Sequence, residues 1–291
     1  MKNLIIAAAA VFTLFSCKQE EKPKSWQLSQ TIITEGVNPI GIAHSAEGIW
    51  LSDGDHNRVV LIDENGKVRK TIDSLDRPMH ISSENSEVVI PQYGNDQIMR
   101  WKEDVVNIMA IEDSLDAPAG VWRRGTEIAI ADFYNNRILY SETGQDWISF
   151  GKEGKAEGEF YYPTDVQITE DRIWVADAYN NRIQAFDKTG KYLQQMGADQ
   201  KMNAATGIYV SDMNVFVTDF ENDRILVFDH QGVLQQEVSE NIAKPTDLIL
   251  INDKLHVINY RNGKINVFEW KEIVANPDGE HEDHDHHDHD H

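Results

Sequence analysis

The end of the chain, from Asp278 to His291, concentrates the residue types that bind transition metals. It contains seven acidic residues, six histidines and no apolar side chain. Imidazole suits zinc, nickel and copper, and neighbouring carboxylates add oxygen ligands. We therefore expect this tail to capture or buffer one of these metals through the following side chains: His281, His284, His286, His287, His289 and His291.

Two other interpretations of this tail stay open. A purification tag is usually an unbroken run of histidine, whereas aspartate interrupts this one. A strongly acidic end can also serve solubility alone. The tail resembles the His/Asp-rich segments of zinc- and nickel-handling proteins, which favours metal capture. Because Asp278 to His291 has no apolar residue to bury, we expect the tail, residues 272–291, to be disordered.

Acidic and basic residues also recur five positions apart: Asp53 and Arg58, Asp132 and Arg137, Asp177 and Arg182, Asp219 and Arg224. Such pairs could serve acid–base chemistry, but an active site is not normally copied around a protein. The two positions also change together, since Gln92 accompanies Gln97 and Asn259 accompanies Lys264. We therefore interpret the acid as a turn residue that accepts backbone N–H groups, and the arginine as a link between strands.

These pairs belong to a repeat of about 40 residues, the period typical of propeller blades. Five of the six units contain a proline at the same place: Pro39, Pro78, Pro118, Pro163 and Pro245, with Ala205 in the fifth unit. In all six units the acid or amide follows the proline position at the same distance along the chain as Asp177 follows Pro163. The basic residue or glutamine follows it at the same distance as Arg182 follows Pro163. Six coincidences at two fixed offsets establish an internal repeat.

Each unit predicts four short antiparallel strands. In the fourth unit the runs Val166 to Ile168, Ile173 to Val175, Ile183 to Phe186 and Lys191 to Met196 alternate or are apolar, with Gly, Asn and Asp between them. No segment of the repeats has a convincing helical period. We therefore predict an all-β fold, a six-bladed β-propeller; a β-sandwich would not repeat at this constant spacing.

The repeats resemble NHL repeats. The resemblance is carried by FGKEGKAEGEFYYPTDVQI, from Phe150 to Ile168, and by DAYNNRIQAF, from Asp177 to Phe186. It covers Pro39 to about Trp270 and implies six blades. The sixth unit supplies only three strands, so we expect WQLSQTII, Trp26 to Ile33, to be the fourth strand and to close the ring. Trp50, Trp122, Trp174, Tyr134 and Tyr179 should pack between blades, a ligand-binding face being the alternative.

The position two residues after each proline is where the innermost strand begins, near one mouth of the central channel. Three units have glycine there and the alternate three have His80, Asp165 and Asp247. Six-fold geometry separates these three by about 120°, and one imidazole with two carboxylates can hold a cation. The alternatives are that the aspartates serve only the backbone and that the ring is too wide for one ion.

The start of the chain predicts export. Lys2 precedes an apolar run from Leu4 to Phe15, which is too short for a comfortable membrane span and typical of a signal peptide. The run ends in Leu-Phe-Ser-Cys and resembles the lipobox of bacterial lipoproteins, which implies cleavage before Cys17 and its acylation. An ordinary signal peptide is the alternative. The acidic residues that follow resemble surface-export signals of some Bacteroidetes lipoproteins.

We thus expect a signal peptide at 1–16, a tether at 17–24, a propeller at 25–271 and a tail at 272–291. The implied location is the cell envelope, on the periplasmic or exposed face of the outer membrane. Cys17 is the only cysteine, so any metal site must use nitrogen and oxygen ligands. No disulfide can form within the chain.

Charge excludes one class of partner. The net charge is −22, with 49 acidic and 27 basic residues. Without the seven acids of the tail and Lys2 of the leader, 42 acidic and 26 basic residues leave a net charge of −16. A body this acidic repels phosphate backbones, so we expect no nucleic-acid partner.

Catalytic motifs give little support for an enzyme. Some propellers of the NHL type are enzymes, and among them the peptide-amidating lyases place zinc-binding histidines directly after the blade proline. This chain has the following residues there: Ile40, Met79, Ala119, Thr164, Thr206 and Thr246. The chain has no G-x-S-x-G elbow, Walker loop or dinucleotide fingerprint. We predict a monomeric binding or scaffolding module for an unidentified protein, peptide or small-molecule ligand. The alternative is a lactonase or lyase-like hydrolase with a cation at the channel mouth.

Overall fold

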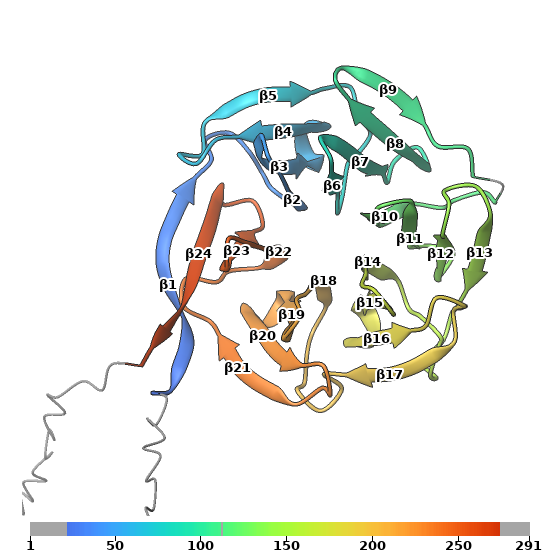
Figure 1. Ribbon diagram of the computed structural model, residues 1–291. Coiled ribbons are helices and arrows are strands. Elements are labelled where there is room, and N and C mark those ends of the chain that lie inside the picture. Colours follow the sequence, from blue (N-terminus) through green and yellow to red (C-terminus); the bar gives the residue numbers. More distant parts are fainter. Residues whose placement is uncertain (1–21, 112, 274–291) are drawn as a thin grey trace, which may run out of the picture.

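Four runs of strand-forming residues in each repeat, separated by turns rich in glycine, asparagine and aspartate, form one antiparallel sheet. The computed structural model describes residues 22–111 and 113–273, and within them six four-stranded sheets stand around a central axis (Figure 1). The predicted all-β, six-bladed propeller is confirmed.

The blades follow one another in chain order, and each runs from the axis outward. Blade one contains β2 (Ile42–Ser45), β3 (Gly48–Asp53), β4 (Arg58–Ile62) and β5 (Val68–Ile72), and blade two contains β6 (Ser82–Glu84), β7 (Glu87–Gln92), β8 (Gln97–Lys102) and β9 (Val105–Ile108). Blade three contains β10 (Pro118–Arg124), β11 (Glu127–Asp132), β12 (Arg137–Ser141) and β13 (Trp147–Phe150), and blade four contains β14 (Pro163–Ile168), β15 (Ile173–Asp177), β16 (Arg182–Phe186) and β17 (Tyr192–Met196). Blade five contains β18 (Ala205–Val210), β19 (Asn214–Asp219), β20 (Arg224–Asp229) and β21 (Leu234–Val238).

The ring is closed by strands from both ends of the described chain. Blade six contains β22 (Pro245–Ile251), β23 (Lys254–Asn259) and β24 (Lys264–Glu272), and its outermost strand is β1 (Lys24–Ile33). The two outer strands pair antiparallel along their length, from Lys24 opposite Glu272 to Ile33 opposite Lys264. The predicted closing strand is therefore confirmed. At the Lys24 end of this pair the first and last described residues lie side by side (Figure 1).

The helical content of the described residues is limited to three short turns. They are η1 (Gly54–His56), η2 (Ala178–Asn180) and η3 (Phe220–Asn222), and each connects the second and third strands of its blade. None of the described residues forms a helix that is long and apolar enough to cross a membrane.

Apolar side chains of neighbouring blades pack against each other to form the core. Trp174 of blade four and Phe228 of blade five belong to one such cluster, and both are fully buried. Trp50 is buried as well, but Tyr134 and Tyr179 are 49% and 58% exposed. Trp50 and Trp174 thus pack between blades in the core, as predicted. The two tyrosines also contact neighbouring blades, Tyr134 against Tyr93 of blade two and Tyr179 against Phe133 of blade three, but they stay half exposed.

In blades three, four and five the repeated aspartate holds the segment that enters the blade. Asp177 is fully buried, and its Oδ1 accepts a hydrogen bond from the backbone N–H of Tyr161 at 2.8 Å. Asp132 and Asp219 reach back in the same way to Asp116 and Asn203. The amide oxygens of Gln92 and Asn259 do likewise. The exchange of aspartate for an amide therefore keeps the side-chain oxygen that accepts the backbone hydrogen bond.

The repeated arginine ties the same two segments together. In blade four, Nε of Arg182 donates to Asp177 at 2.8 Å, and Nη2 donates to the carbonyls of Ala156 and Glu159. Ion pairs of the same kind join Arg58 to Asp53, Arg137 to Asp132 and Arg224 to Asp219. These residues thus lie in structural turns, and each pair fixes the segment that leads in from the preceding blade.

The closing strand gives a test with a matched control. Ile32 is 6% exposed and packs among residues of blades one and six, whereas the neighbouring Ile33 is 61% exposed. Ile32→Ala should lower the unfolding free energy by about 2–4 kcal/mol, because it leaves a cavity, and Ile33→Ala by less than about 0.5 kcal/mol. Deletion of residues 25–34 should sharply lower the melting temperature in a calorimetric scan. An unchanged melt would refute closure by this strand.

A second test uses the turn of blade four. Asp177→Ala should cost about 3–5 kcal/mol in urea unfolding, because it leaves the buried Arg182 without its carboxylate. The double variant Asp177→Asn with Arg182→Lys reproduces the pair found in blade six and should lose clearly less. Equal losses in the two variants would contradict the structural role of the pair.

Candidate functional site

Three side chains from alternate blades meet at the axis of the ring. His80 leads into β6, Asp165 lies on β14 and Asp247 lies on β22. Each offers one ligand atom, and these three atoms lie within 4.8 Å of one another. The Nδ1 atom of His80 is 3.3 Å from Oδ2 of Asp247 and 3.9 Å from Oδ2 of Asp165. The three residues, here called the axial triad, are only 3–5% exposed.

Glycines in the other three blades allow the innermost strands to approach so closely. A Cβ atom on Gly120 would lie 2.6 Å from the carbonyl oxygen of Thr164 and 2.9 Å from Cα of Asp165. Gly41 abuts the backbone of His80 and Gly207 abuts that of Asp247 in the same way. Glycine and triad residues therefore alternate because each glycine makes room for the backbone of the next blade.

The remaining three junctions between blades are joined by hydrogen bonds at the same level. Oδ2 of Asp165 accepts from the backbone N–H of Ile208 in blade five, and Oδ2 of Asp247 accepts from that of Ile42 in blade one, both at 3.0 Å. His80 joins blade three through its backbone, which donates to Ala119 at 2.9 Å. The aspartates thus serve the backbone as well as the axis.

The position directly after the proline also has a structural role in this chain. The hydroxyl of Thr164 donates to the carbonyl of Thr206 at 2.8 Å, and that of Thr206 lies 3.2 Å from the carbonyl of Thr246. Where the peptide-amidating lyases have zinc-binding histidines, blades four and five thus use threonine hydroxyls to bridge to the next blade.

The electrostatics of the axial triad are dominated by burial. Burial raises the pKa of Asp165, and the nearby Asp247 adds to this, although His80 opposes it. Burial alone would lower the pKa of His80, but the two carboxylates outweigh it and the net shift is upward. The Nδ1 atom of His80 makes no well-directed hydrogen bond, even to the oxygen at 3.3 Å. A nitrogen that is both buried and without a partner is unusual in a folded protein.

An open cavity of about 590 Å³ lies on the axis, at the ends of the innermost strands that are opposite to the axial triad. Ser82, Gln167 and Ile249 line it, and each stands two residues beyond a member of the axial triad. Because side chains alternate along a strand, residues two apart point to the same side and are separated by roughly 6.6 Å. The triad therefore lies below the floor of the cavity.

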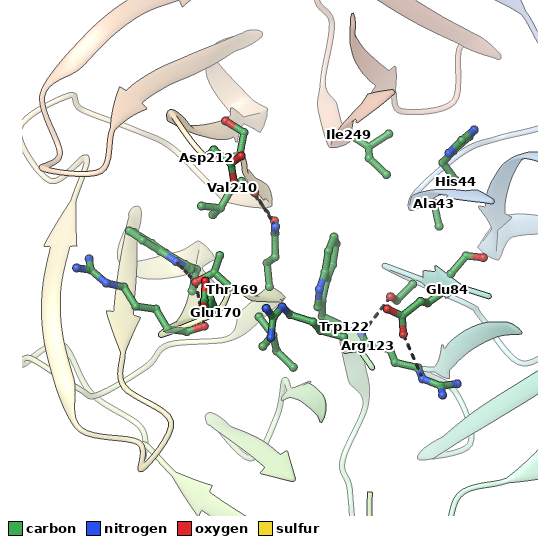
Figure 2. A pocket seen from close by; sticks show the side chains of 18 of the residues that line it. Ala43, His44, Glu84, Trp122, Arg123, Thr169, Glu170, Val210, Asp212 and Ile249 are labelled. Atoms are coloured by element: carbon green, nitrogen blue, oxygen red, sulfur yellow. Dashed lines mark hydrogen bonds and ion pairs between the residues drawn. The ribbon is translucent and has the colours of Figure 1, made fainter. Parts of the chain in front are cut away.

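The cavity, here called the axial cavity, has an aromatic centre and an acidic side. Trp122 lies in the middle of the lining side chains, with Glu170 and Asp212 to one side of it (Figure 2). Each lining arginine has a carboxylate partner, since Arg123 pairs with Glu84 and Glu87, Arg124 with Glu127, and Arg172 with Asp171. Among the described residues, no ion pair involves Glu170 or Asp212.

Nothing in the repeat pattern pointed to these two acids. They lie in turns between the first and second strands, where the six units share no pattern. Trp122 was predicted to pack between blades, with a ligand-binding face as the alternative; it is half-buried and lines the axial cavity. Cys17 and the six tail histidines lie outside the described residues, so the geometry of those sites is not part of the structure.

Comparisons with known proteins agree with the fold. The family model for the NHL repeat matches residues 160–186, which include β14, β15 and β16 of blade four. The chain is 41% identical over 49 residues to protein lin-41 of Caenorhabditis elegans, a match that covers 16% of this chain and 4% of lin-41. The chain thus spans only a small part of that relative.

Solved structures resemble nearly the whole ring. A gluconolactonase from Xanthomonas campestris has a TM-score of 0.67 at 12% identity, covering 86% of this chain and 100% of that one. Virginiamycin B lyase from Staphylococcus aureus has a TM-score of 0.63 at 15% identity, covering 84% and 99%. At these identities the likeness establishes the fold alone. The protein is therefore a six-bladed β-propeller that carries an NHL repeat.

The alternation around the axis predicts the effect of a single methyl group. Gly120→Ala should cost about 1–3 kcal/mol in unfolding experiments, because the new Cβ meets backbone atoms that cannot move aside independently. Gly41→Ala and Gly207→Ala occupy equivalent places and should behave alike. Unchanged stability in all three variants would contradict the close approach at the axis.

Proposed function

We propose that the protein is a binding module whose ligand site is the axial cavity, and that its ligand is a small organic cation. The observation that carries this proposal is that Glu170 and Asp212 line the same cavity as Trp122 and have no cationic partner in the described part of the chain, whereas each lining arginine has a carboxylate partner. The cavity thus offers a ligand both negative charge and an aromatic ring.

An organic ammonium group fits that combination. Its charge is attracted by the two carboxylates, and its alkyl groups can contact the indole face, where a cation–π interaction contributes about 0.5–2 kcal/mol. The Trp174 ring, by contrast, is already occupied by Arg172, which stacks 5.6 Å from its centroid. The net charge of −22 would further raise the local concentration of cations.

The ends of the chain complete the proposal. Acylation of Cys17 would anchor an exported protein to the envelope membrane, and the tail would capture zinc, nickel or copper. Lys24 and Glu272 face each other at the outer edge of blade six, so the segments that precede β1 and follow β24 join the ring at one place. This arrangement would keep the tail near the membrane surface that holds the anchor.

A lactonase or lyase-like hydrolase is the alternative, favoured by the triad as a cation site and by the fold shared with such enzymes. A catalytic cation must reach its substrate, yet the triad is 3–5% exposed and lies below the cavity floor. Its burial fits a structural position better than a catalytic one, which is why we give preference to the binding module.

Calorimetric titration with choline and spermidine as cationic probes, and citrate and glucose as anionic and neutral ones, tests the proposal. The cations should bind in preference, and Glu170→Gln with Asp212→Asn should weaken their binding at least about tenfold, or about 1.4 kcal/mol. The control is Glu240→Gln with Asp104→Asn, which removes the same charge from exposed sites away from the axial cavity.

Two outcomes would count against the binding module. A preference for citrate, or an equal loss of affinity for the cations in the control variant, would refute recognition of a cation in the cavity. Hydrolysis of gluconolactone that disappears in His80→Ala would instead establish the enzyme.

A further inference from the structure

The axial triad is a separate site from the axial cavity and has the donor set of a metal centre. One imidazole nitrogen and two carboxylate oxygens come from three different blades and converge on the axis. The Nδ1 atom of His80 is buried, points into the cluster and has no hydrogen-bond partner. A buried nitrogen without a partner destabilises the fold unless something binds it.

The charge of the axial triad also requires compensation. Two buried carboxylates carry two negative charges when both are ionised, and His80 is the sole cationic side chain that the described residues place against them. A divalent cation bound to neutral imidazole would balance both ionised carboxylates, whose burial without a partner is costly.

The spacing of the three atoms fits a first-row transition metal. Tetrahedral zinc with bonds of about 2.0–2.1 Å places its ligands about 3.3 Å apart. The His80–Asp247 distance is 3.3 Å, and the His80–Asp165 distance of 3.9 Å requires only a small inward shift. Each Oδ2 accepts one backbone N–H, which orients the carboxylate and leaves a second lone pair for the ion.

We propose that His80, Asp165 and Asp247 together bind one divalent transition metal ion, with zinc as the best fit, and that this ion ties blades two, four and six at the axis. Imidazole favours zinc over magnesium and calcium, which prefer oxygen ligands alone. A bound water molecule would fill the fourth position. The role is structural and does not depend on what the axial cavity binds.

The test uses the full chain with all six tail histidines changed to asparagine, which leaves the described residues untouched. After dialysis against zinc and removal of excess ion, elemental analysis should find one zinc per chain, and zinc should raise the melting temperature. His80→Ala in this background should lose both effects. The matched control is His230→Ala, a half-buried histidine outside the triad, which should keep both effects.

Cobalt provides a measurement that does not depend on the stability of a variant. Titration of the tail-substituted protein with Co²⁺ should give visible absorption bands of a low-coordinate ion that saturate at one equivalent. Absence of zinc and of these bands in the tail-substituted protein would overturn the proposal and assign all bound metal to the tail. Retention of zinc by a folded His80→Ala variant would overturn it as well. Neither result would change cation binding in the axial cavity.

Discussion

The ring depends on how closely the innermost strands approach one another at the axis. Three of the six junctions are so tight that only glycine fits, and the other three are joined by hydrogen bonds from Asp165, Asp247 and the backbone of His80. A six-fold repeat therefore becomes an alternation with three-fold character. Side chains that can do chemistry stand in every second blade because the blades between them have no space for a Cβ atom.

Much of this architecture could be predicted from one chain. The two fixed offsets from the blade proline established the repeat, and the missing fourth strand of the last unit identified β1 as the closing strand. The same offsets placed His80, Asp165 and Asp247 at one level of the channel. Whether the three side chains could touch was beyond the sequence, because the width of the channel depends on strand tilt and on the packing of large side chains such as Trp174 between blades.

The parts that could not be predicted lie where the repeats differ. Glu170 and Asp212 stand in turns that have no common pattern, so nothing linked them to each other or to Trp122 before the ring was assembled. Tyr134 and Tyr179 contact aromatic rings of neighbouring blades, as predicted, but about half of each side chain is exposed, which the repeat pattern did not indicate. Local pattern determines the strand, whereas the exposure of a turn depends on what the neighbouring blade places beside it.

The axis is the organising element of the molecule, with the axial cavity, the proposed ligand site, at one end and the proposed metal-binding triad beneath it. Anomalous diffraction at the zinc edge from crystals of the zinc-loaded protein tests this claim most directly. We expect a single strong peak on the axis, within bonding distance of His80 Nδ1 and of the Oδ2 atoms of Asp165 and Asp247. A map without a peak there, or with His80 hydrogen-bonded to a carboxylate in its place, would contradict it.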